Sequence, residues 1–386
     1  MRILLVNDYP SGGGAEVHLY ALERLLGACG HHTELLLGSR HPIHYASRMF
    51  NPWLLWLAWR RMKAFAPDIV HVHKYNLVWS VAPFLAARML GIPVVCTQHD
   101  FGAVCPEGWM LRPDGEVCQR GVGPWCFSSK CQRSTTVALD LYRRFNLVKL
   151  TLQIPVLKRT VAAFTAPSEF LARWVERVYP GVPSHALPLF IDSPDPQPID
   201  QPQGVFTMFH AGRIEREKGL DVLMRAMAMG HDVRLRIAGD GGAVGDLRSL
   251  SRTLGLEDKV VWLGKIGRDQ VLRECRAAHL AVLPSLWVEN APVFVLEAMR
   301  EGCPVAASRV GGYPDLIEDG RNGYLVDRNS VEGWSRLLGR LISQGFDRRG
   351  AAKNAQDGIR QRHSPELFLQ KIEGIYRSVL SGKRGV

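Results

Sequence analysis

Residues 206–227 read FTMFHAGRIEREKGLDVLMRAM and carry the clearest strand–turn–helix signal in the chain. The apolar run 206–210 has the length of a buried strand, the turn 212–219 begins and ends with glycine, and apolar residues of 220–227 recur at helical spacing. A strand that leads through a glycine turn into a helix is the repeating unit of parallel sheets, which helices cover on both faces. The stretch therefore predicts an α/β fold.

The same alternation occurs on both sides of this stretch. Apolar runs predict strands at 3–6, 33–37, 68–72, 94–97 and 164–166, and then at 206–210, 233–238, 260–263, 280–283, 305–308 and 324–326. The two series are separated at 192–204, which is rich in proline and lacks apolar periodicity. We expect two doubly wound, Rossmann-like domains, 1–192 and 205–386, joined by a linker at 193–204 and facing each other across a ligand-binding cleft. The C-terminal helix is a candidate to cross back to the first domain.

The composition is that of a globular protein with a basic surface. The chain has 386 residues, of which 46% are hydrophobic and 22% charged, and its net charge is +11. Such an excess suits a protein that binds a phosphorylated ligand, a nucleic acid or an anionic membrane, and it also occurs in merely basic enzymes. No stretch is long and apolar enough for a transmembrane helix, and the run 3–6 is too short for a signal peptide. We expect a cytoplasmic protein, for which association with the inner face of the cell membrane stays open.

The turn 212–219 has the composition of an anion-binding site. Gly212 lets the backbone approach a ligand closely, and the helix that follows offers free N–H groups at its N-terminus. Arg213 adds a planar fork of donors and Lys218 adds a flexible point charge, so that together they suit a diphosphate. The alternative is a charged turn that is exposed to solvent and binds nothing.

The segment 289–297 contains two glutamates eight positions apart. We expect Asn290 to cap a helix whose first turn holds Pro292, which places Glu289 in the preceding loop and Glu297 inside the helix. Since Glu297 lies in an apolar run, its carboxylate requires a partner, and a ribose diol is suited to that role. The alternative is a glutamate on the polar face of an ordinary helix.

The order and separation of these two motifs resemble those of the retaining glycosyltransferases of family four (glycosyltransferase group 1), which have the GT-B fold. The first motif has the pattern GR-x4-KG and the second the pattern E-x7-E. The resemblance begins at the glycine loop 12–16, continues through 68–73 and 97–100, and is strongest from 210 to 326. It implies two Rossmann-like domains, the second of which binds a nucleotide-sugar donor.

The resemblance also implies roles for individual residues. Arg213 and Lys218 would bind the donor diphosphate. Glu289 would lie beside the donor sugar, and His99 of the first domain would point at it, so that these four are the catalytic candidates. The remaining donor-binding candidates are Gly13, Gly14, Gly212, Lys265, Ile266, Asn290, Ala291, Val293 and Glu297, of which Glu297 would bind the ribose. Many members of the family have Glu-Gly-Phe-Gly where this chain has Glu-Asn-Ala-Pro at 289–292, a change that we expect to alter the sugar pocket.

The function that the resemblance implies is transfer of a hexosyl group, with retention, from a UDP- or GDP-sugar to a glycan or lipid-linked acceptor in surface polysaccharide biosynthesis. The chain has no Asp-x-Asp motif, so we expect Arg213, Lys218 and helix N-termini to neutralise the leaving diphosphate without a metal or other cofactor. A sugar-nucleotide epimerase of the same fold and a non-catalytic sugar-nucleotide binder stay open as alternatives. A nicotinamide dehydrogenase is disfavoured because the loop 12–17 lacks the last small residue of the dinucleotide fingerprint. Nucleic acid is not expected as a partner because no nucleic-acid-binding motif is present.

Four of the eight cysteines are crowded into one loop, and these are Cys105, Cys118, Cys126 and Cys131. Four thiolates suit a structural zinc ion, which would stabilise a long loop that has no core of its own. Their spacing is not that of a Cys-x-x-Cys ribbon, so unligated thiols are the alternative. His71 and His73 lie one residue apart near the end of a strand and are either a metal pair or residues that shape the interdomain cleft.

Two segments of the first domain combine apolar and basic residues. The segment 51–65 carries Trp53, Trp56 and Trp59 and then a basic run, and 141–159 has a similar mixture. Both suit peripheral docking on an anionic membrane that holds a lipid-linked acceptor. The alternative for 51–65 is a helix that packs on the sheet of the first domain.

Overall fold

The computed structural model describes residues 1–11, 13–39, 49–112, 114–128, 131, 137–191, 199, 202–343 and 345–382, without the side chains of 137–140. The chain forms two compact units. Unit 1 comprises Met1–Phe190 and Pro365–Val386, and unit 2 comprises Ile191–Ser364. Most of the predicted linker at 193–204 lies outside the described residues.

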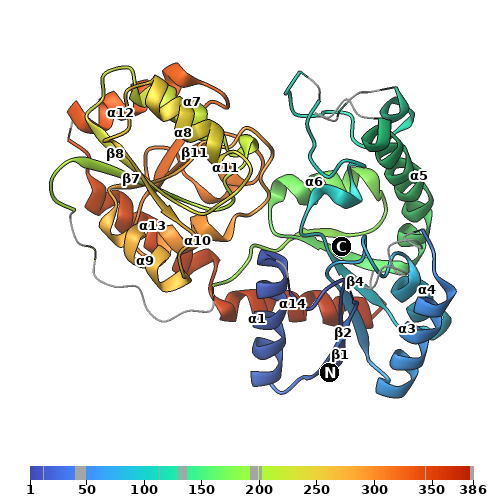
Figure 1. Ribbon diagram of the computed structural model, residues 1–386. Coiled ribbons are helices and arrows are strands. Elements are labelled where there is room, and N and C mark those ends of the chain that lie inside the picture. The colour runs from blue at the N-terminus through green and yellow to red at the C-terminus, as the bar shows by residue number, and fades with distance from the viewer. Residues whose placement is uncertain are drawn as a thin grey trace. The chain divides into compact units, whose positions relative to one another are not determined.

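Unit 1 is built on a parallel six-stranded sheet in the order β2-β1-β3-β4-β5-β6. Its strands are β1 (Arg2–Asn7), β2 (His32–Leu37), β3 (Ile69–Val72), β4 (Val94–Thr97), β5 (Val161–Ala166) and β6 (Ser184–Ala186). One face is covered by α1 (Gly14–Ala28) and α14 (Pro365–Leu380), the other by α3 (Pro52–Phe65), α4 (Ala82–Met89) and α5 (Val137–Thr160), as Figure 1 shows. Between β5 and β6 lies α6 (Glu169–Val178). The strand order reverses between β1 and β3, where sheets of this kind bind ligands.

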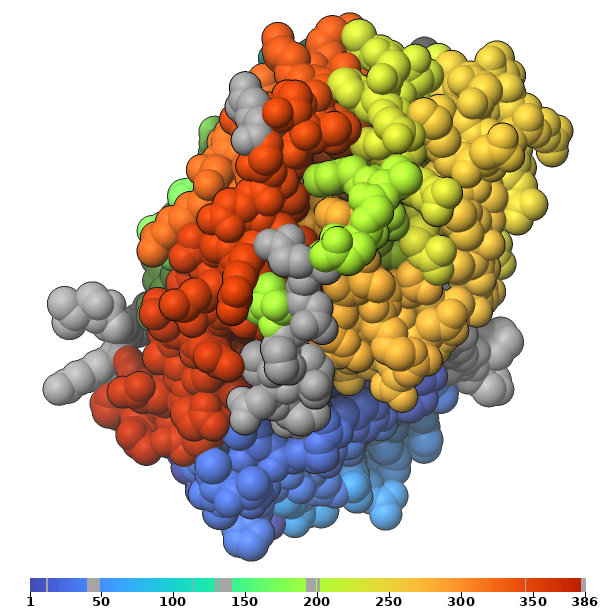
Figure 2. Space-filling view, turned by 90° about the vertical axis from the view of Figure 1, so that its left-hand side faces the viewer, coloured from blue at the N-terminus to red at the C-terminus, as the bar shows by residue number. Residues whose placement is uncertain are grey.

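Unit 2 is a second parallel six-stranded sheet, in the order β12-β11-β10-β7-β8-β9. Its strands are β7 (Phe206–Ala211), β8 (Val233–Ala238), β9 (Val260–Gly264), β10 (Leu280–Leu283), β11 (Val305–Ser308) and β12 (Gly323–Val326). One face is covered by α7 (Leu220–Met227), α8 (Val244–Thr253) and α12 (Val331–Ser343), and the other by α9 (Arg268–Ala277), α10 (Val293–Arg300) and α13 (Arg348–Arg362) (Figure 1). The helix α13 packs on α10, and in the space-filling view of Figure 2 the orange-red atoms of this part of unit 2 lie at the surface. The order reverses between β7 and β10.

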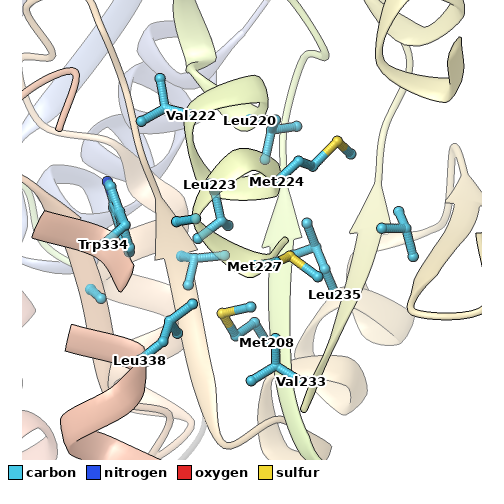
Figure 3. Close-up of a cluster of buried hydrophobic side chains, with 14 of the residues drawn as sticks. Met208, Leu220, Val222, Leu223, Met224, Met227, Val233, Leu235, Trp334 and Leu338 are labelled. Atoms are coloured by element: carbon cyan, nitrogen blue, oxygen red, sulfur yellow. The ribbon is translucent and has the colours of Figure 1, made fainter. Parts of the chain in front are cut away.

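The core of unit 2 lies between the sheet and the helices α7 and α12. Figure 3 shows Met208 of β7, Leu223 of α7, Leu235 of β8, and Trp334 and Leu338 of α12 turned toward one another. Each of these side chains is fully buried. Burying an aliphatic or aromatic side chain of this size contributes roughly 1.5–3 kcal/mol, so the layer holds α7 and the turn before it in place.

The C-terminal helix α14 belongs to the core of unit 1. Its Phe368 and Ile372 are buried with Leu19 and Leu22 of α1. The hydroxyl of Tyr376 lies 2.7 Å from Nδ1 of His71, which fastens the helix to strand β3. The last helix of the chain therefore stabilises the unit that contains the first strand.

The structure departs from the sequence-based expectation at two elements of unit 1. The strand β6 was not predicted, because its three residues include a serine and a histidine and lack an apolar run. The apolar pattern of residues 78–90 predicts a helix over that whole stretch, but the helix α4 begins only at Ala82. The cause is Asp8, whose carboxylate accepts hydrogen bonds from the backbone N–H groups of residues 77–79 and holds them in a turn.

Candidate functional site

The two motifs of unit 2 lie in the loops that follow β7 and β10. The turn 212–219 connects β7 to α7, and residues 284–292 connect β10 to α10. These two strands are neighbours, and the strand order of the sheet reverses between them. Ligands of doubly wound sheets bind at the carboxyl ends of the strands at this position, so the topology places both motifs at the expected ligand site.

Two glycines allow these loops to approach each other closely. Gly219 has φ +66°, and a Cβ atom on it would lie 2.1 Å from the carbonyl oxygen of Pro284. Gly311, after β11, has φ +62°, and its Cβ would lie 2.0 Å from the carbonyl oxygen of Glu289. The same oxygen accepts a hydrogen bond of 2.8 Å from the N–H of Gly312. No other residue fits at either position without moving the motif loops.

An ion pair joins the two motifs. The ammonium of Lys218 lies 2.6 Å from Oε1 of Glu289, and both side chains are largely buried. The hydroxyl of Ser285 donates to the same carboxylate oxygen at 3.1 Å and lies 3.1 Å from the hydroxyl of Tyr313. The ammonium also stands 5.2 Å above the ring of Trp287. The lysine is thereby held in one place, next to a carboxylate that is itself fixed by a hydroxyl.

Arg213 is the more exposed of the two cations. Its side chain is 65% exposed, and its nearest ion-pair contact is Glu217 at 4.0 Å. The preceding Gly212 has φ +157°, and Gly239 after β8 approaches so closely that its Cβ would lie 1.8 Å from the Gly212 carbonyl oxygen. The backbone of the turn is therefore fixed while the guanidinium of Arg213 stays accessible to a ligand.

The second glutamate of the motif is paired with an arginine. Oε1 of Glu297 lies 2.8 Å from Nε of Arg268, the first residue of α9. Glu297 lies inside α10 and Glu289 in the loop before it, as predicted. The predicted cap was wrong: α10 begins at Val293, and Pro292 occupies the cap position instead of Asn290. Proline cannot donate a hydrogen bond, and its fixed φ prepares the chain for the first helical residue.

The other donor-binding candidates of unit 2 lie around this pair of loops. Asn290, Ala291 and Val293 are partly exposed at the start of α10. Lys265 follows β9, is largely exposed, and has its Nζ 3.4 Å from a carboxylate oxygen of Asp240. Ile266 beside it is half-buried. A ligand at the carboxyl edge of this sheet would meet these residues together with the α10 N-terminus.

One residue of this region was missed by the sequence analysis. His210 is the last but one residue of β7 and is buried, with Nδ1 2.9 Å from the carbonyl oxygen of Val282. Within the described residues, its Nε2 has no hydrogen-bond partner. Burial lowers the pKa of His210 to about 4, so the ring is neutral at pH 7. The unpartnered nitrogen beside the glycine turn makes His210 a candidate for ligand contact. The signal that could have found it is a polar residue at the end of a buried strand.

The candidates of unit 1 lie after β1 and β4. Gly13 precedes α1, and its N–H donates a hydrogen bond of 2.8 Å to a carboxylate oxygen of Glu16, while Gly14 is the first residue of the helix. His99 follows β4, and its Nε2 lies 2.9 Å from Nδ1 of His73. Burial holds the pKa of both histidines well below its usual range, and the neighbouring histidines and, for His99, also Lys74 lower it further. Both imidazoles are therefore neutral and can exchange hydrogen bonds, but they do not carry charge.

His71 has a structural role. Its Nε2 lies 2.7 Å from the hydroxyl of Thr97 and its Nδ1 2.7 Å from that of Tyr376. The rings of His71 and His73 lie 4.3 Å apart, as a metal pair would require. Both nitrogens of His71, however, already bind hydroxyl groups. Across all described residues, no three His, Cys, Asp or Glu side chains stand at metal-ligand spacing as they are placed.

The segments with tryptophans and basic residues form helices with one exposed apolar side. In α3, Leu54, Ala58 and Met62 are buried, so the helix packs on unit 1, while Trp53 and Trp56 are 60% and 40% exposed and stacked on each other. In α5, four exposed apolar residues recur at helical spacing, and these are Leu141, Phe145, Val148 and Leu152. No helix within the described ranges is long and apolar enough to cross a membrane.

Two family models match consecutive parts of the chain. The model described as Glycosyltransferase Family 4 matches residues 12–193, and the model described as Glycosyl transferases group 1 matches residues 193–358. The boundary between them falls at the end of unit 1. Together they include both motif loops of unit 2 and the candidate residues of unit 1.

Similar sequences and structures agree with these matches. A D-inositol 3-phosphate glycosyltransferase of Mycobacterium sp. (strain KMS) is 36% identical over 151 residues, which are 37% of this chain and 34% of the relative. The chain thus aligns with about a third of the length of that relative. A protein of the same description from Saccharomonospora viridis is 29% identical over 82% of this chain and 72% of its own. The crystal structure of Anabaena HepE in complex with UDP has a TM-score of 0.69 and 19% identity, and covers 98% of this chain and all of that one. The likeness confirms the predicted α/β architecture of two Rossmann-like sheets, the GT-B fold.

Proposed function

Since this chain is of the family-four (group 1) glycosyltransferase type, we propose that it transfers a hexosyl group from a UDP- or GDP-sugar to a glycan or lipid-linked acceptor, with retention at the anomeric carbon. The observation that carries the proposal is the convergence of the two motifs at the strand reversal of unit 2, where Lys218 and Glu289 meet at 2.6 Å. HepE, which shares the fold, has been crystallised with UDP and with UDP-glucose.

The charge of the site suits a diphosphate leaving group. Negative charge grows on the diphosphate as the glycosidic bond breaks, and preorganised cations and dipoles stabilise it best. Arg213 is accessible and Lys218 is fixed, and the α10 N-terminus adds backbone N–H groups at the same edge of the sheet. These groups support a reaction that needs no metal ion.

The two glutamates have different partners and therefore different proposed roles. Glu289 holds Lys218 and is fixed by Ser285, so it can position the ammonium and accept a hydroxyl of the donor sugar. Glu297 is paired with Arg268, which is more than half exposed. We assign Glu297 to the ribose hydroxyls, for which the carboxylate keeps a second oxygen.

In unit 1 we assign His99 to the reacting sugar and the backbone of Gly13 and Gly14 to the donor. Support for His99 comes from its neutral ring, which is bonded to His73 and follows a strand beside the reversal of the sheet. A neutral imidazole can donate one hydrogen bond to a sugar hydroxyl without placing a positive charge beside a cationic transition state.

The test is release of nucleoside diphosphate from a panel of UDP-, GDP- and dTDP-sugars, with EDTA present. We expect turnover of one donor, and a loss of about 10²-fold in Lys218→Ala, as when a donor to a developing oxyanion is removed. Glu297→Ala is expected to weaken donor binding, while Lys353→Ala, an exposed lysine of α13, is the control with unchanged turnover. The anomeric configuration of the product, measured by NMR, tests retention. Absence of both release and binding for every donor would refute the donor site.

We further propose that unit 1 docks on an anionic membrane surface, where a lipid-linked acceptor is found. The support is the stacked, exposed pair Trp53 and Trp56 on α3, with Arg60 5.3 Å from the Trp56 ring, and the exposed apolar side of α5. Exposed tryptophans beside basic residues favour the lipid interface. Binding to vesicles with and without anionic lipid measures this. We expect the double variant Trp53→Ser, Trp56→Ser to lose binding, and equal binding of both proteins would contradict the assignment.

A further inference from the structure

The four cysteines of the loop 105–131 are not used by the proposed transfer reaction, yet the fold brings them together. They come from separate places in unit 1: Cys105 follows a one-turn helix at 101–103, Cys118 follows a hairpin, Cys126 lies in a second one-turn helix at 124–127, and Cys131 lies beyond it. All four line a single pocket that is partly open to solvent. The other lining residues are Pro106, Glu107, Met110, Leu111, Gly121 and Arg143.

Backbone hydrogen bonds produce this convergence. The chain turns back on itself between 111 and 117, where Leu111 and Val117 form an antiparallel bridge. The N–H of Cys118 then donates to the carbonyl oxygen of Met110 at 2.8 Å. The backbone N–H groups of residues 107–110 hydrogen-bond the sulfur of Cys105. These backbone donors fix the position of the Cys105 sulfur in the pocket that it shares with the other three cysteines.

The loop has little regular secondary structure, although Met110 and Leu111 are buried in it. From residue 98 to 131, the described residues contain two one-turn helices and one isolated bridge as their only regular structure. Three of the aromatic side chains, Trp109, Trp125 and Phe127, are substantially exposed instead of forming a core. Long segments of this kind that keep a defined structure are usually fastened by a cross-link, a metal or a ligand.

A buried cation stands beside the thiols. Arg143 of α5 is almost fully buried, donates a hydrogen bond of 2.6 Å to the carbonyl oxygen of Cys126, and has Nε 3.9 Å from Glu107. Four thiolates around a divalent ion carry a net charge of −2, and the Arg143 guanidinium offsets part of it while it also faces Glu107, which lines the same pocket. The neighbouring helix α5 therefore complements a metal–thiolate centre.

We propose that Cys105, Cys118, Cys126 and Cys131 bind one structural zinc ion that fastens the loop 105–131 to unit 1. Zinc accepts four thiolates in a closed tetrahedron and then has no position for a substrate, so the centre is structural. As they are placed, the thiols line the pocket without yet standing at metal-ligand spacing. Binding draws the four sulfurs inward to the ion and releases one proton from each thiol.

Counting zinc and counting thiols together distinguish a zinc site from two disulfides and from four unligated thiols. The full-length protein is purified without added reductant in buffers that contain zinc and is dialysed to remove unbound metal, and its zinc is counted by mass spectrometry. Its thiols are then counted in denaturant with a chelator. Zinc binding predicts about one zinc and all eight thiols, two disulfides predict no zinc and four thiols, and unligated cysteines predict no zinc and eight thiols. Either of the last two results would overturn the proposal.

The ligands are tested with serine variants. Cys118→Ser is expected to reduce the zinc content from about one to less than about 0.3 per chain, while Cys29→Ser, an exposed cysteine of the same unit, keeps it at about one. If Cys118→Ser does not fold, the native protein answers the question: chelator should expose four further thiols and increase proteolysis within 105–131. The same zinc content in both variants, or chelator without effect on thiol reactivity, would show that these cysteines are not the ligands.

Discussion

The close contact at Gly311 gives a prediction that separates the geometry of the site from the stability of the fold. Gly311 has φ +62°, and an alanine Cβ there would lie 2.0 Å from the carbonyl oxygen of Glu289. Real Cβ atoms do not approach closer than 3.0 Å, so the Glu289 backbone must move by about 1 Å. Gly320 is the matched control, because it has φ +78° and open space where its Cβ would be.

Both substitutions carry the same backbone penalty, but only one displaces the site. A left-handed conformation costs a residue other than glycine roughly 1–2 kcal/mol, so Gly311→Ala and Gly320→Ala should lower the free energy of unfolding by at least that amount. The displacement in Gly311→Ala moves the carboxylate that holds Lys218 at 2.6 Å. A misplacement of about 1 Å at a reacting centre costs on the order of 10²-fold in rate. We therefore expect kcat/KM to fall about 100-fold in Gly311→Ala and less than about threefold in Gly320→Ala.

The assay is donor turnover by the two variants at a temperature at which both are folded, with circular dichroism and urea unfolding to confirm it. Calorimetric titration with the nucleoside diphosphate adds a measurement that does not depend on the acceptor. If both variants lose turnover equally, the loss of stability explains the result, and the close contact of Gly311 with Glu289 does not affect the rate. If neither loses turnover, Glu289 does not position the reacting groups.

Three further predictions concern stability. Burial lowers the pKa of His18 to about 4, from a value near 6.5 in the unfolded chain. The buried ring must therefore be neutral, and its contribution to the free energy of unfolding is intact above pH 6.5 and is lost as the pH falls toward 4. At pH 5 the loss is about 2 kcal/mol. Hydrogen exchange of β1 peptides at pH 7 and pH 5 measures this, and His18→Phe should reduce the difference. Tyr376→Phe removes the hydroxyl that His71 binds and should cost about 1–3 kcal/mol in unit 1, measured by the same exchange; no change would mean that water replaces the hydroxyl. Leu338→Ala opens a cavity in unit 2 and should cost about 2–5 kcal/mol in urea unfolding, whereas Leu380→Ala, at an exposed position, should cost less than about 0.5 kcal/mol.

The strands of unit 2 could be predicted because each is a short apolar run bounded by polar or turn residues. The same rule found β1 to β5 but not β6, whose pairing with β5 rests on backbone hydrogen bonds and not on apolar side chains. Apolar periodicity also could not predict the residue at which α4 begins. This start depends on the carboxylate of Asp8, nearly seventy positions earlier in the chain, which binds the turn before the helix.

The residue types predicted the two motifs of the site, but they did not predict which side chains form ion pairs with the motif residues. Lys218 and Glu289 were both predicted as ligands, yet nothing in the pattern indicated that they bind each other. Glu297 was expected to need a partner, and the structure supplies Arg268. His210 went unnoticed because one histidine in an apolar strand is most often a packing residue.

Local periodicity by itself determined that this chain forms alternating strands and helices, that the sheets are parallel, and that glycine and basic residues follow the first strand of the second series. These features depend on neighbours along the chain, whose spacing sets which side chains share a face. The folded chain alone reveals that the loops after β7, β10 and β11 contact one another through Gly219 and Gly311, and that four cysteines from one loop share a pocket. Such contacts depend on the order of strands in the sheet and on close approach of distant backbone segments, which the pattern of single residues does not encode.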